Sequence, residues 1–307
     1  MDSESVRRLV IEAGAVAAGV AEAAPVNAAD IGLYQSWLAS GRHAGMEYME
    51  RYSDVRSDPR LLLDGARSIV AAAFNYYTPR NSGAGGLKWA RYALGRDYHD
   101  ELRERLGRVA AVITESTGHA CRVCVDTAPL RERYWAVRAG LGFTGRNGAL
   151  IVPGHGSWCL LAFIITTLPL APDAPCSQTA CDGCGLCVKS CPGHALDGLG
   201  GVDARRCRSW LTIENRAEAL AEPLGDRIYG CDICQEVCPH NRDARPSEIE
   251  AFTPREPILE LGRGDILSMD QPAFSTIFTR SAIKRAKLAG LRRNALNIKD
   301  SKGPKDL

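Results

Sequence analysis

The 307-residue sequence lacks long hydrophobic runs and any excess of charge of one sign. Its best apolar stretch, residues 158–168, is shorter than the roughly 20 residues that span a bilayer. Net charge is only +2, so overall charge gives no argument for binding to nucleic acid. The phosphate-loop motif G-x-x-x-x-G-K-S/T is missing, which excludes that nucleotide site. With 45% hydrophobic and 24% charged residues, the composition is that of a globular protein with two or three domains.

The N-terminus only partly resembles a secretory signal. Arg7 and Arg8 precede the alanine-rich segment 9–24, but Glu12 and Glu22 lie inside that segment. The hydrophobic region of a secretory signal carries no such charges. We therefore expect a cytoplasmic protein without membrane association.

Cysteine, by contrast, is abundant, and eight of the twelve cysteines are regularly spaced. Four follow C-x2-C-x2-C-x3-C before a proline, one stands alone, and three follow C-x2-C-x3-C before another proline. In this pattern three close thiolates ligate one 4Fe-4S cluster, and the cysteine before the proline ligates the other. We predict Cys181, Cys184, Cys187 and Cys238 as ligands of cluster 1, and Cys191, Cys207, Cys231 and Cys234 as ligands of cluster 2.

Zinc sites and disulfides are the alternatives for these eight cysteines. Structural zinc usually takes two C-x2-C pairs separated by a dozen or more residues. Disulfides would imply a secreted chain. Of the other cysteines, Cys121 and Cys124 resemble a redox or zinc pair but lie in a strand-like run, where residues three apart face opposite ways. Buried free cysteines are the alternative for this pair, as for Cys159 and Cys176.

Hydrophobic patterning divides the chain into three parts. Strands are expected at 68–75, 120–125, 150–152 and 158–167, and helices at about 3–18, 34–40, 97–116 and 129–139. This alternation predicts an α/β or α+β domain over residues 1–172, which a proline-rich linker joins to a cluster module at 173–245. Within the module, a helix over 202–216 is expected to carry Cys207. The tail, 246–307, reads as polar and proline-interrupted, and then as helical from residue 281.

Two segments of the first domain and one of the tail are candidates for further chemistry. Asp126 follows a strand at a strand-to-helix turn, where α/β proteins place functional groups, but a helix N-cap explains the same position. The glycine-rich segment 140–148 follows a helix rather than a strand, so we reject a dinucleotide site there. In the tail, the segment 281–297 is rich in lysine and arginine. Such a cluster can pair with nucleic-acid phosphates or form a solvated helix face.

Several motifs together resemble the epoxyqueuosine reductase family. They are R-Y-A-L-G-R-D-Y-H at 91–99, V-D-T-A-P at 125–129, A-G-L-G-F-T-G at 139–145, D-A-R-R-C at 203–207, L-T-I-E at 211–214 and R-I-Y-G-C-D-I-C-Q at 227–235. The likeness covers nearly the whole chain and keeps the order of the motifs, which makes it more specific than the cysteines alone.

The resemblance implies a cobalamin held between a nitroreductase-like α+β domain and a ferredoxin-like module with two 4Fe-4S clusters. A short helical tail would be a truncated part of a HEAT-like repeat region. The family reduces the epoxide of epoxyqueuosine, at the tRNA wobble position, to the alkene of queuosine. Electrons would pass from an external low-potential donor through the clusters to cobalt, giving cob(I)alamin, a strong nucleophile. The substrate would be the anticodon stem-loop of tRNA, and we expect a monomer.

The resemblance also implies roles for individual residues. Asp126 matches the proton donor, and burial in a closed pocket would raise its pKa. His99 and Arg133 match residues near the substrate. The expected cobalamin contacts are Arg56, Ala90, Asp126, Leu150, Leu161, Ser209 and Asp232. Longer relatives hold tRNA with helical repeats. In this chain we expect the basic tail to take that role, with Lys284, Arg285, Arg292 and Arg293 in contact with tRNA.

Three other functions remain as alternatives. A reductive dehalogenase shares the pairing of corrinoid and iron–sulfur domains but usually carries a twin-arginine signal. In this sequence two arginines stand at residues 7–8, but the hydrophobic region that completes such a signal does not follow them. A ferredoxin-like electron carrier would hold clusters without cobalamin. A reductive activator would act on the cobalt of a partner protein.

Overall fold

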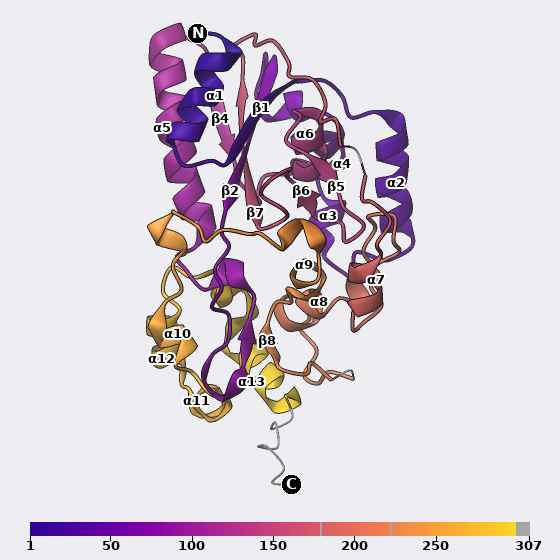
Figure 1. Ribbon diagram of the computed structural model, residues 1–307, viewed down its shortest axis with the longest axis vertical. Coiled ribbons are helices and arrows are strands. Elements are labelled where there is room, and N and C mark those ends of the chain that lie inside the picture. The colour runs from indigo at the N-terminus through magenta and orange to yellow at the C-terminus, as the bar shows by residue number, and fades with distance from the viewer. Residues whose placement is uncertain (179, 222, 299–307) are drawn as a thin grey trace.

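An antiparallel sheet forms the upper half of the protein in the computed structural model (Figure 1). The structure describes residues 1–178, 180–221 and 223–298. The strand order is β1-β2-β7-β4, with bounds Ala17–Glu22, Ser68–Asn75, Cys159–Thr166 and Cys121–Cys124. The two central strands, β2 and β7, are covered on both faces, which is why their sequences are almost uninterrupted apolar runs. The predicted strands 68–75, 120–125 and 158–167 are thus confirmed.

Helices cover both faces of this sheet. α1 (Ser3–Glu12) and α5 (Tyr98–Thr117) pack on one face, and α6 (Glu132–Arg138) packs on the other (Figure 1). Since successive strand residues face opposite ways, Cys121 joins the core under α5 and Cys124 joins the core under α6. The two thiols therefore face opposite sides of the sheet, as expected.

The remaining elements are short. The helices are α2 (Ala28–Ala39), α3 (Glu47–Glu50), α4 (Ser53–Ser57), α7 (Leu186–Ser190), α8 (Arg208–Ile213), α9 (Ile233–Glu236), α10 (Glu256–Leu259), α11 (Arg263–Ser268), α12 (Gln271–Ile277) and α13 (Lys287–Asn297). β3 (Lys88–Trp89) pairs in parallel with β8 (Arg227–Tyr229), and β5 (Phe143–Thr144) pairs with β6 (Leu150–Ile151). This architecture agrees with the predicted α+β class and helical C-terminal segment.

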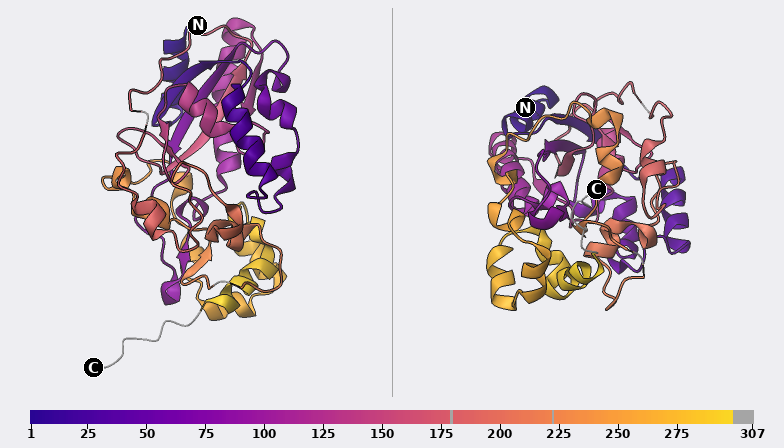
Figure 2. Two further views of the ribbon diagram at one scale, coloured as in Figure 1. Left: turned by 90° about the vertical axis from the view of Figure 1, so that its right-hand side faces the viewer. Right: turned by 60° about the horizontal axis from the view of Figure 1, so that its bottom comes forward.

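The tail differs from the prediction. Three helices, α10 to α12, occupy a segment that was expected to be polar and irregular, and most of its apolar residues are buried. Ile258, Ile266 and Phe278 are fully buried, in a core shared with residues 87–94 and 224–229. Figure 2 shows these helices lying beside the cluster module rather than projecting from it. The predicted helix from residue 281 is also divided, since a 3₁₀ turn, Ala282–Ala286, precedes α13 and Lys287 has a positive φ of 60°.

The prediction that Cys207 lies inside a helix is wrong. Cys207 is instead the N-cap residue of α8. A 3₁₀ turn, Ala204–Arg206, precedes it, and Asp203 caps that turn through a hydrogen bond from the Arg205 amide. This aspartate starts a new helical turn, because its side chain satisfies an amide that has no intrahelical partner. Cys207 therefore lies in extended backbone between two helical turns.

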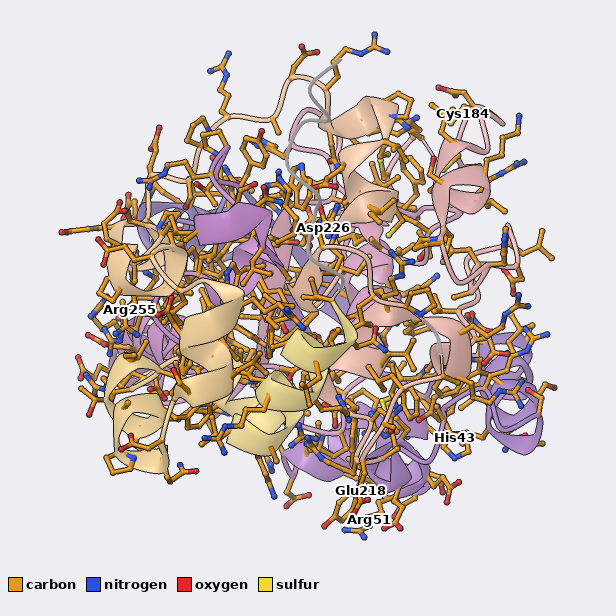
Figure 3. All side chains as sticks on the ribbon, turned by 90° about the horizontal axis from the view of Figure 1, so that it is seen from below. His43, Arg51, Cys184, Glu218, Asp226 and Arg255 are labelled. Atoms are coloured by element: carbon orange, nitrogen blue, oxygen red, sulfur yellow. The ribbon has the colours of Figure 1, made fainter. Side chains whose placement is uncertain are left out.

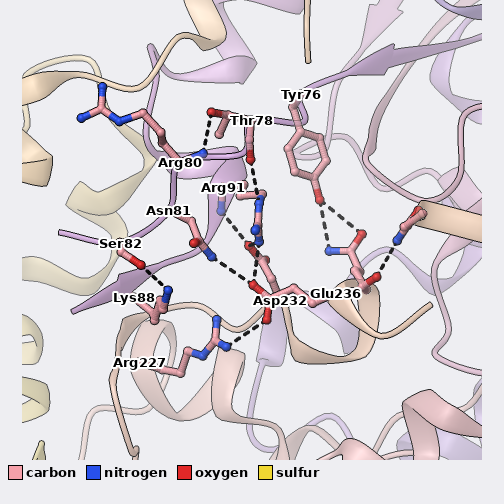
Figure 4. A network of polar contacts seen from close by, with 12 residues as sticks. Tyr76, Thr78, Arg80, Asn81, Ser82, Lys88, Arg91, Arg227, Asp232 and Glu236 are labelled. Carbon is pink, nitrogen blue, oxygen red and sulfur yellow. Dashed lines mark hydrogen bonds and ion pairs between the residues drawn. The ribbon is translucent and has the colours of Figure 1, made fainter. Parts of the chain in front are cut away.

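A buried ionic network joins the cluster module to the segment that leaves the sheet (Figure 4). Arg91 donates from its backbone amide and from Nη1 to Oδ2 of Asp232, at 2.9 and 3.2 Å, and from Nη1 to Glu236 at 2.8 Å. Arg227 donates to the other oxygen of Glu236 at 2.9 Å. The Arg91 guanidinium also lies 4.9 Å from the ring centre of Trp158, the residue that precedes β7. Because Arg91 and Asp232 are hydrogen-bonded to each other, this buried ion pair can be tolerated.

Among residues 1–298, apart from 179 and 222, no helix combines the length and apolarity needed to cross a membrane.

Candidate active site and cluster cavity

The four cysteines predicted for cluster 1 line one cavity of about 240 Å³. Cys187 lies in α7, Cys238 is the N-cap of a 3₁₀ turn, and Cys181 and Cys184 lie in the loop before α7. Cys184 is exposed, at the edge of the molecule (Figure 3). The Arg146 amide donates to the sulfur of Cys181 at 3.4 Å. These four cysteines, which are distant in sequence, thus line one cavity, and a backbone N–H donates to one of their sulfurs.

The four cysteines predicted for cluster 2 form a second group. Burial raises the pKa of the Cys234 thiol, and the charges of Cys231, Cys207 and Cys191 raise it further. Burial likewise raises the pKa of Cys231 to about 11, with Cys207 again contributing. The charges of these thiols thus act on one another. Thiols of this kind give up their protons to a metal cluster, so the group fits a second 4Fe-4S site.

The imidazole of His99 lies between two carboxylates. Nδ1 is 2.7 Å from Oδ1 of Asp97, and Nε2 is 2.9 Å from Oδ2 of Asp126. Asp97 is the N-cap of α5, so the start of the helix holds the His99 ring at its Nδ1 side. Tyr98 stacks on the same ring, with 4.0 Å between ring centres. The sequence motif D-Y-H therefore serves to hold one imidazole in a defined orientation.

Asp126 lies in a strained turn after β4. Its φ is 52°, and the Thr127 amide donates to the carbonyl of Val125 at 2.5 Å, which closes a three-residue γ-turn. The Asp126 amide donates to Oε1 of Glu132 at 2.6 Å. α6 begins only at Glu132, with Arg131 as N-cap, so the interpretation of Asp126 as a helix cap is wrong. Strain of this kind is concentrated at functional sites.

The proton of this site lies on the histidine. Although partial burial opposes its charge, hydrogen bonds to Asp126 and Asp97 raise the pKa of His99 to about 9. Burial raises the pKa of Asp126, but the hydrogen bond and charge of His99 outweigh it and leave that pKa below its usual value. The expectation of a raised pKa for Asp126 is therefore wrong in this geometry. At neutral pH the pair holds one proton, as an imidazolium beside a carboxylate.

Glu132, which sequence reasoning did not single out, has a raised pKa beside Asp126. Burial and the nearby charge of Asp126 raise the pKa of Glu132 to about 8. The only sequence signal was its place in the first turn after the Asp126 loop, next to Arg133. Arg133 itself is exposed and donates to the carbonyl of Gly148, so it braces the glycine-rich loop.

Residues from distant segments surround this site. Arg285, from the tail, donates two hydrogen bonds to Glu214 at 2.8 and 2.9 Å, and its guanidinium lies 5.6 Å from the ring centre of Tyr48. The charge of Arg285 also contributes to lowering the pKa of Asp126. Arg56 donates to the carbonyl of Tyr48 at 3.0 Å. The first domain, the cluster module and the tail thus all contribute to the rim around Asp126.

The residues expected at cobalamin divide into two groups. Arg56, Asp126, Leu161 and Ser209 are at least partly accessible. Ala90, Leu150 and Asp232 are only 3, 5 and 2% exposed, because the protein itself packs over them. Nη1 of Arg131 is buried and donates no hydrogen bond to any of the described residues. A corrinoid carries amide carbonyls, which are acceptors of the kind that this group lacks.

The four basic residues expected at tRNA differ in availability. Lys284 and Arg285 are both exposed. Arg292 is half-buried and donates to the carbonyl of Met269. Arg293 is 7% exposed and donates to the carbonyls of Leu211, Asn215 and Ala217. The expectation for Arg293 is therefore wrong, because its guanidinium holds the tail against α8 and has no free face for a phosphate.

Two family models match this chain. One, for the epoxyqueuosine reductase QueG domain DUF1730, matches residues 56–127 and so covers His99 and Asp126. The other, for a 4Fe-4S double cluster binding domain, matches residues 180–241 and so covers all eight predicted ligands. The chain therefore contains a binding domain for iron–sulfur clusters.

Curated relatives match over almost the full length. The chain is 40% identical to an epoxyqueuosine reductase of Cyclobacterium marinum over 275 residues, which are 87% of each protein. It is 39% identical to one of Synechococcus sp. strain CC9605 over 95% of this chain and 93% of the relative.

Solved structures agree with this relationship. An epoxyqueuosine reductase crystallised with an epoxyqueuosine-modified tRNA stem loop superposes with a TM-score of 0.87 and 28% identity, over 95% of this chain and 79% of that one. The Bacillus subtilis enzyme, with its catalytic aspartate loop swung out of the active site, gives 0.84. A reductive dehalogenase, NpRdhA, reaches 0.52 at 16% identity and shares the fold alone. The chain is an oxidoreductase that belongs to the epoxyqueuosine reductase family.

Proposed function

We propose that this protein reduces the epoxide of epoxyqueuosine in tRNA to the alkene of queuosine. The reaction consumes two electrons and two protons and releases the epoxide oxygen as water. The observation that carries the proposal is the His99–Asp126 pair, which holds one transferable proton at a rim built by all three parts of the chain. Relatives at about 40% identity bear the same enzyme name, and one related structure contains the modified stem loop.

Electrons would enter through the cluster module from an external low-potential donor. The eight cysteines would hold two 4Fe-4S clusters, divided as the cavity and the second cysteine group suggest. Cobalamin, bound near Arg56, Arg131 and Ser209, would supply in its cob(I)alamin form the reducing and nucleophilic chemistry that no side chain provides. The alternatives, an electron carrier or activator, leave the acid site around Asp126 without a purpose.

Asp126 would deliver the proton to the departing oxygen. In the resting geometry its carboxylate is ionised, and the proton lies on Nε2 of His99, 2.9 Å away. As negative charge develops on the substrate oxygen, the proton can pass from the imidazolium through Asp126 to that oxygen. Asp97 then stabilises His99 throughout, because its carboxylate stays hydrogen-bonded to Nδ1. The proton donor is thus a pair of residues rather than one carboxylic acid with a raised pKa.

Lys284 and Arg285 would meet the phosphates of the anticodon stem-loop. Arg285 lies close enough to Asp126 to affect its pKa, so a stem-loop that reaches it also reaches the acid site. The protein is expected to act as a monomer.

The test is turnover of an epoxyqueuosine-containing anticodon stem-loop by anaerobically purified protein with a strong reductant. Formation of queuosine that depends on added cobalamin and on the clusters supports the proposal. Reconstituted protein with full clusters and cobalamin that leaves the epoxide intact would overturn it.

A further inference from the structure

Besides the bond within the turn, side chains from two helices form hydrogen bonds to the turn that carries Asp126. From α5, Nε2 of His99 binds the Asp126 carboxylate at 2.9 Å, and Nη2 of Arg103 donates to the Thr127 hydroxyl at 2.7 Å. From α6, Oε1 of Glu132 accepts from the Asp126 backbone amide at 2.6 Å. Of the three, only the bond to Glu132 acts on the backbone of Asp126 itself.

Glu132 is well placed to fix this backbone. It is the first residue of α6, and the following residues, Trp135 and Ala136, are 2% and 0% exposed in the core against the sheet. Its carboxyl is therefore carried by an anchored helix. The turn that it holds needs such support, because a positive φ at a residue other than glycine is unfavourable and γ-turns of this sign are rare.

We propose that Glu132 is a positioning residue, which keeps the Asp126 carboxylate aimed at His99 by accepting the Asp126 amide. This inference rests on the proposed role of Asp126 as proton donor. Without the acceptor, the amide would be left unpaired and the turn would relax to a more common conformation, in which the carboxylate leaves Nε2 of His99. Burial and the charge of Asp126 raise the pKa of Glu132 to about 8. The neutral carboxyl, like the carboxylate, accepts the Asp126 amide hydrogen bond, because its carbonyl oxygen is the acceptor.

The neutral carboxyl has an isosteric mimic, which separates positioning from charge. Glu132→Gln keeps an oxygen acceptor of the same reach, whereas Glu132→Leu removes it at similar volume. Under the proposal, Glu132→Leu lowers kcat by roughly 10–100-fold with little change in KM, since misplacing a reacting group by about 1 Å costs that much. Glu132→Gln recovers most of that loss. Glu12→Leu, at an exposed site on α1, is the control for adding a leucine.

A second readout does not depend on turnover. Histidine-labelled holoprotein with oxidised clusters is titrated by NMR, and the His99 signal is assigned with His99→Gln. The pKa of His99, about 9 in the wild type, should fall by one unit or more in Glu132→Leu and stay within half a unit in Glu132→Gln. A wild-type His99 pKa in a folded Glu132→Leu variant would overturn the proposal, as would an equal fall in both variants.

The two readouts keep failures apart. If the wild type does not reduce epoxyqueuosine, the proposed function fails, yet the titration still decides whether Glu132 orients Asp126. If Glu132→Leu loses its clusters or unfolds, Glu132→Asp, which shortens the acceptor by one carbon within the same helix, replaces it, and a wild-type His99 pKa there contradicts the proposal.

Discussion

Nε2 of His99 lies 2.9 Å from Oδ2 of Asp126, across a gap of 27 residues in the sequence. The contact exists because Asp97 fixes the ring at the start of α5 and a γ-turn aims the carboxylate from the end of β4. Neither residue alone has the properties expected of an acid at neutral pH. Together they hold one proton that can be passed on.

Replacing Asp126 with asparagine should abolish most activity while leaving the cofactors bound. We expect kcat to fall by roughly 10²–10⁴-fold, the usual contribution of a general acid. Iron and cobalamin contents should match the wild type, and Asp64→Asn, at an exposed site, should remain active. Unchanged turnover of epoxyqueuosine by Asp126→Asn would remove this residue from the mechanism.

The His99 pair should make stability depend on pH. The pKa of His99 is raised to about 9 in the folded protein from about 6.5 in the unfolded protein. The contribution of His99 to the free energy of unfolding is therefore full below pH 6.5 and is lost as pH rises through 9. The gap in Tm between wild type and His99→Gln should therefore be largest near pH 6 and shrink towards pH 10. Melting curves across this range provide the measurement, with His155→Gln, an exposed histidine, as control. A gap that is constant with pH contradicts the assignment.

Arg91 should be important for stability rather than for chemistry. Arg91→Leu leaves Asp232 buried without its ionic partner, which typically costs about 3–5 kcal/mol. Arg80→Leu breaks an exposed pair with Glu256 and should cost less than about 1 kcal/mol. Chemical denaturation of both variants under anaerobic conditions tests the difference, and equal losses would show that the network of Figure 4 does not hold the two segments together.

The basic residues of the tail should separate into two classes. Arg285→Glu, at the active-site rim, should weaken binding of the anticodon stem-loop, more at low salt than at high salt. Arg293→Glu should instead destabilise the fold, because its guanidinium is buried against three carbonyls. Arg108→Glu, on the exposed face of α5, is the control. Equal affinity of Arg285→Glu and wild type at low salt would exclude this contact.

The sequence predicted those features that depend on spacing or on local pattern. Cysteine spacing was sufficient to place Cys238 with Cys181, since the ligand swap before each proline is a property of the motif. The two central strands of the sheet, β2 and β7, followed from continuous apolar runs. The place of Asp126 at the end of a strand made it a candidate but also fitted a helix cap, and its role as proton donor came from the family resemblance. Its pKa was not predicted, because that depends on a histidine from another element.

What the sequence could not give are contacts between distant segments. The role of Arg293 depends on carbonyls of α8 and its C-terminal turn, which no periodicity in the tail reveals. The helices α10 to α12 are too short for a clear 3.6-residue pattern and form because a shared core buries them. Glu132 became visible only when its hydrogen bond to the Asp126 amide was known.

Anaerobic metal and cofactor analysis of the purified, reconstituted chain tests the central claim most directly. The account predicts about eight Fe and one cobalamin per chain, with about four Fe lost when Cys238 is replaced by alanine. Colourless protein that contains zinc, or iron-loaded protein that takes up no corrinoid, would contradict it.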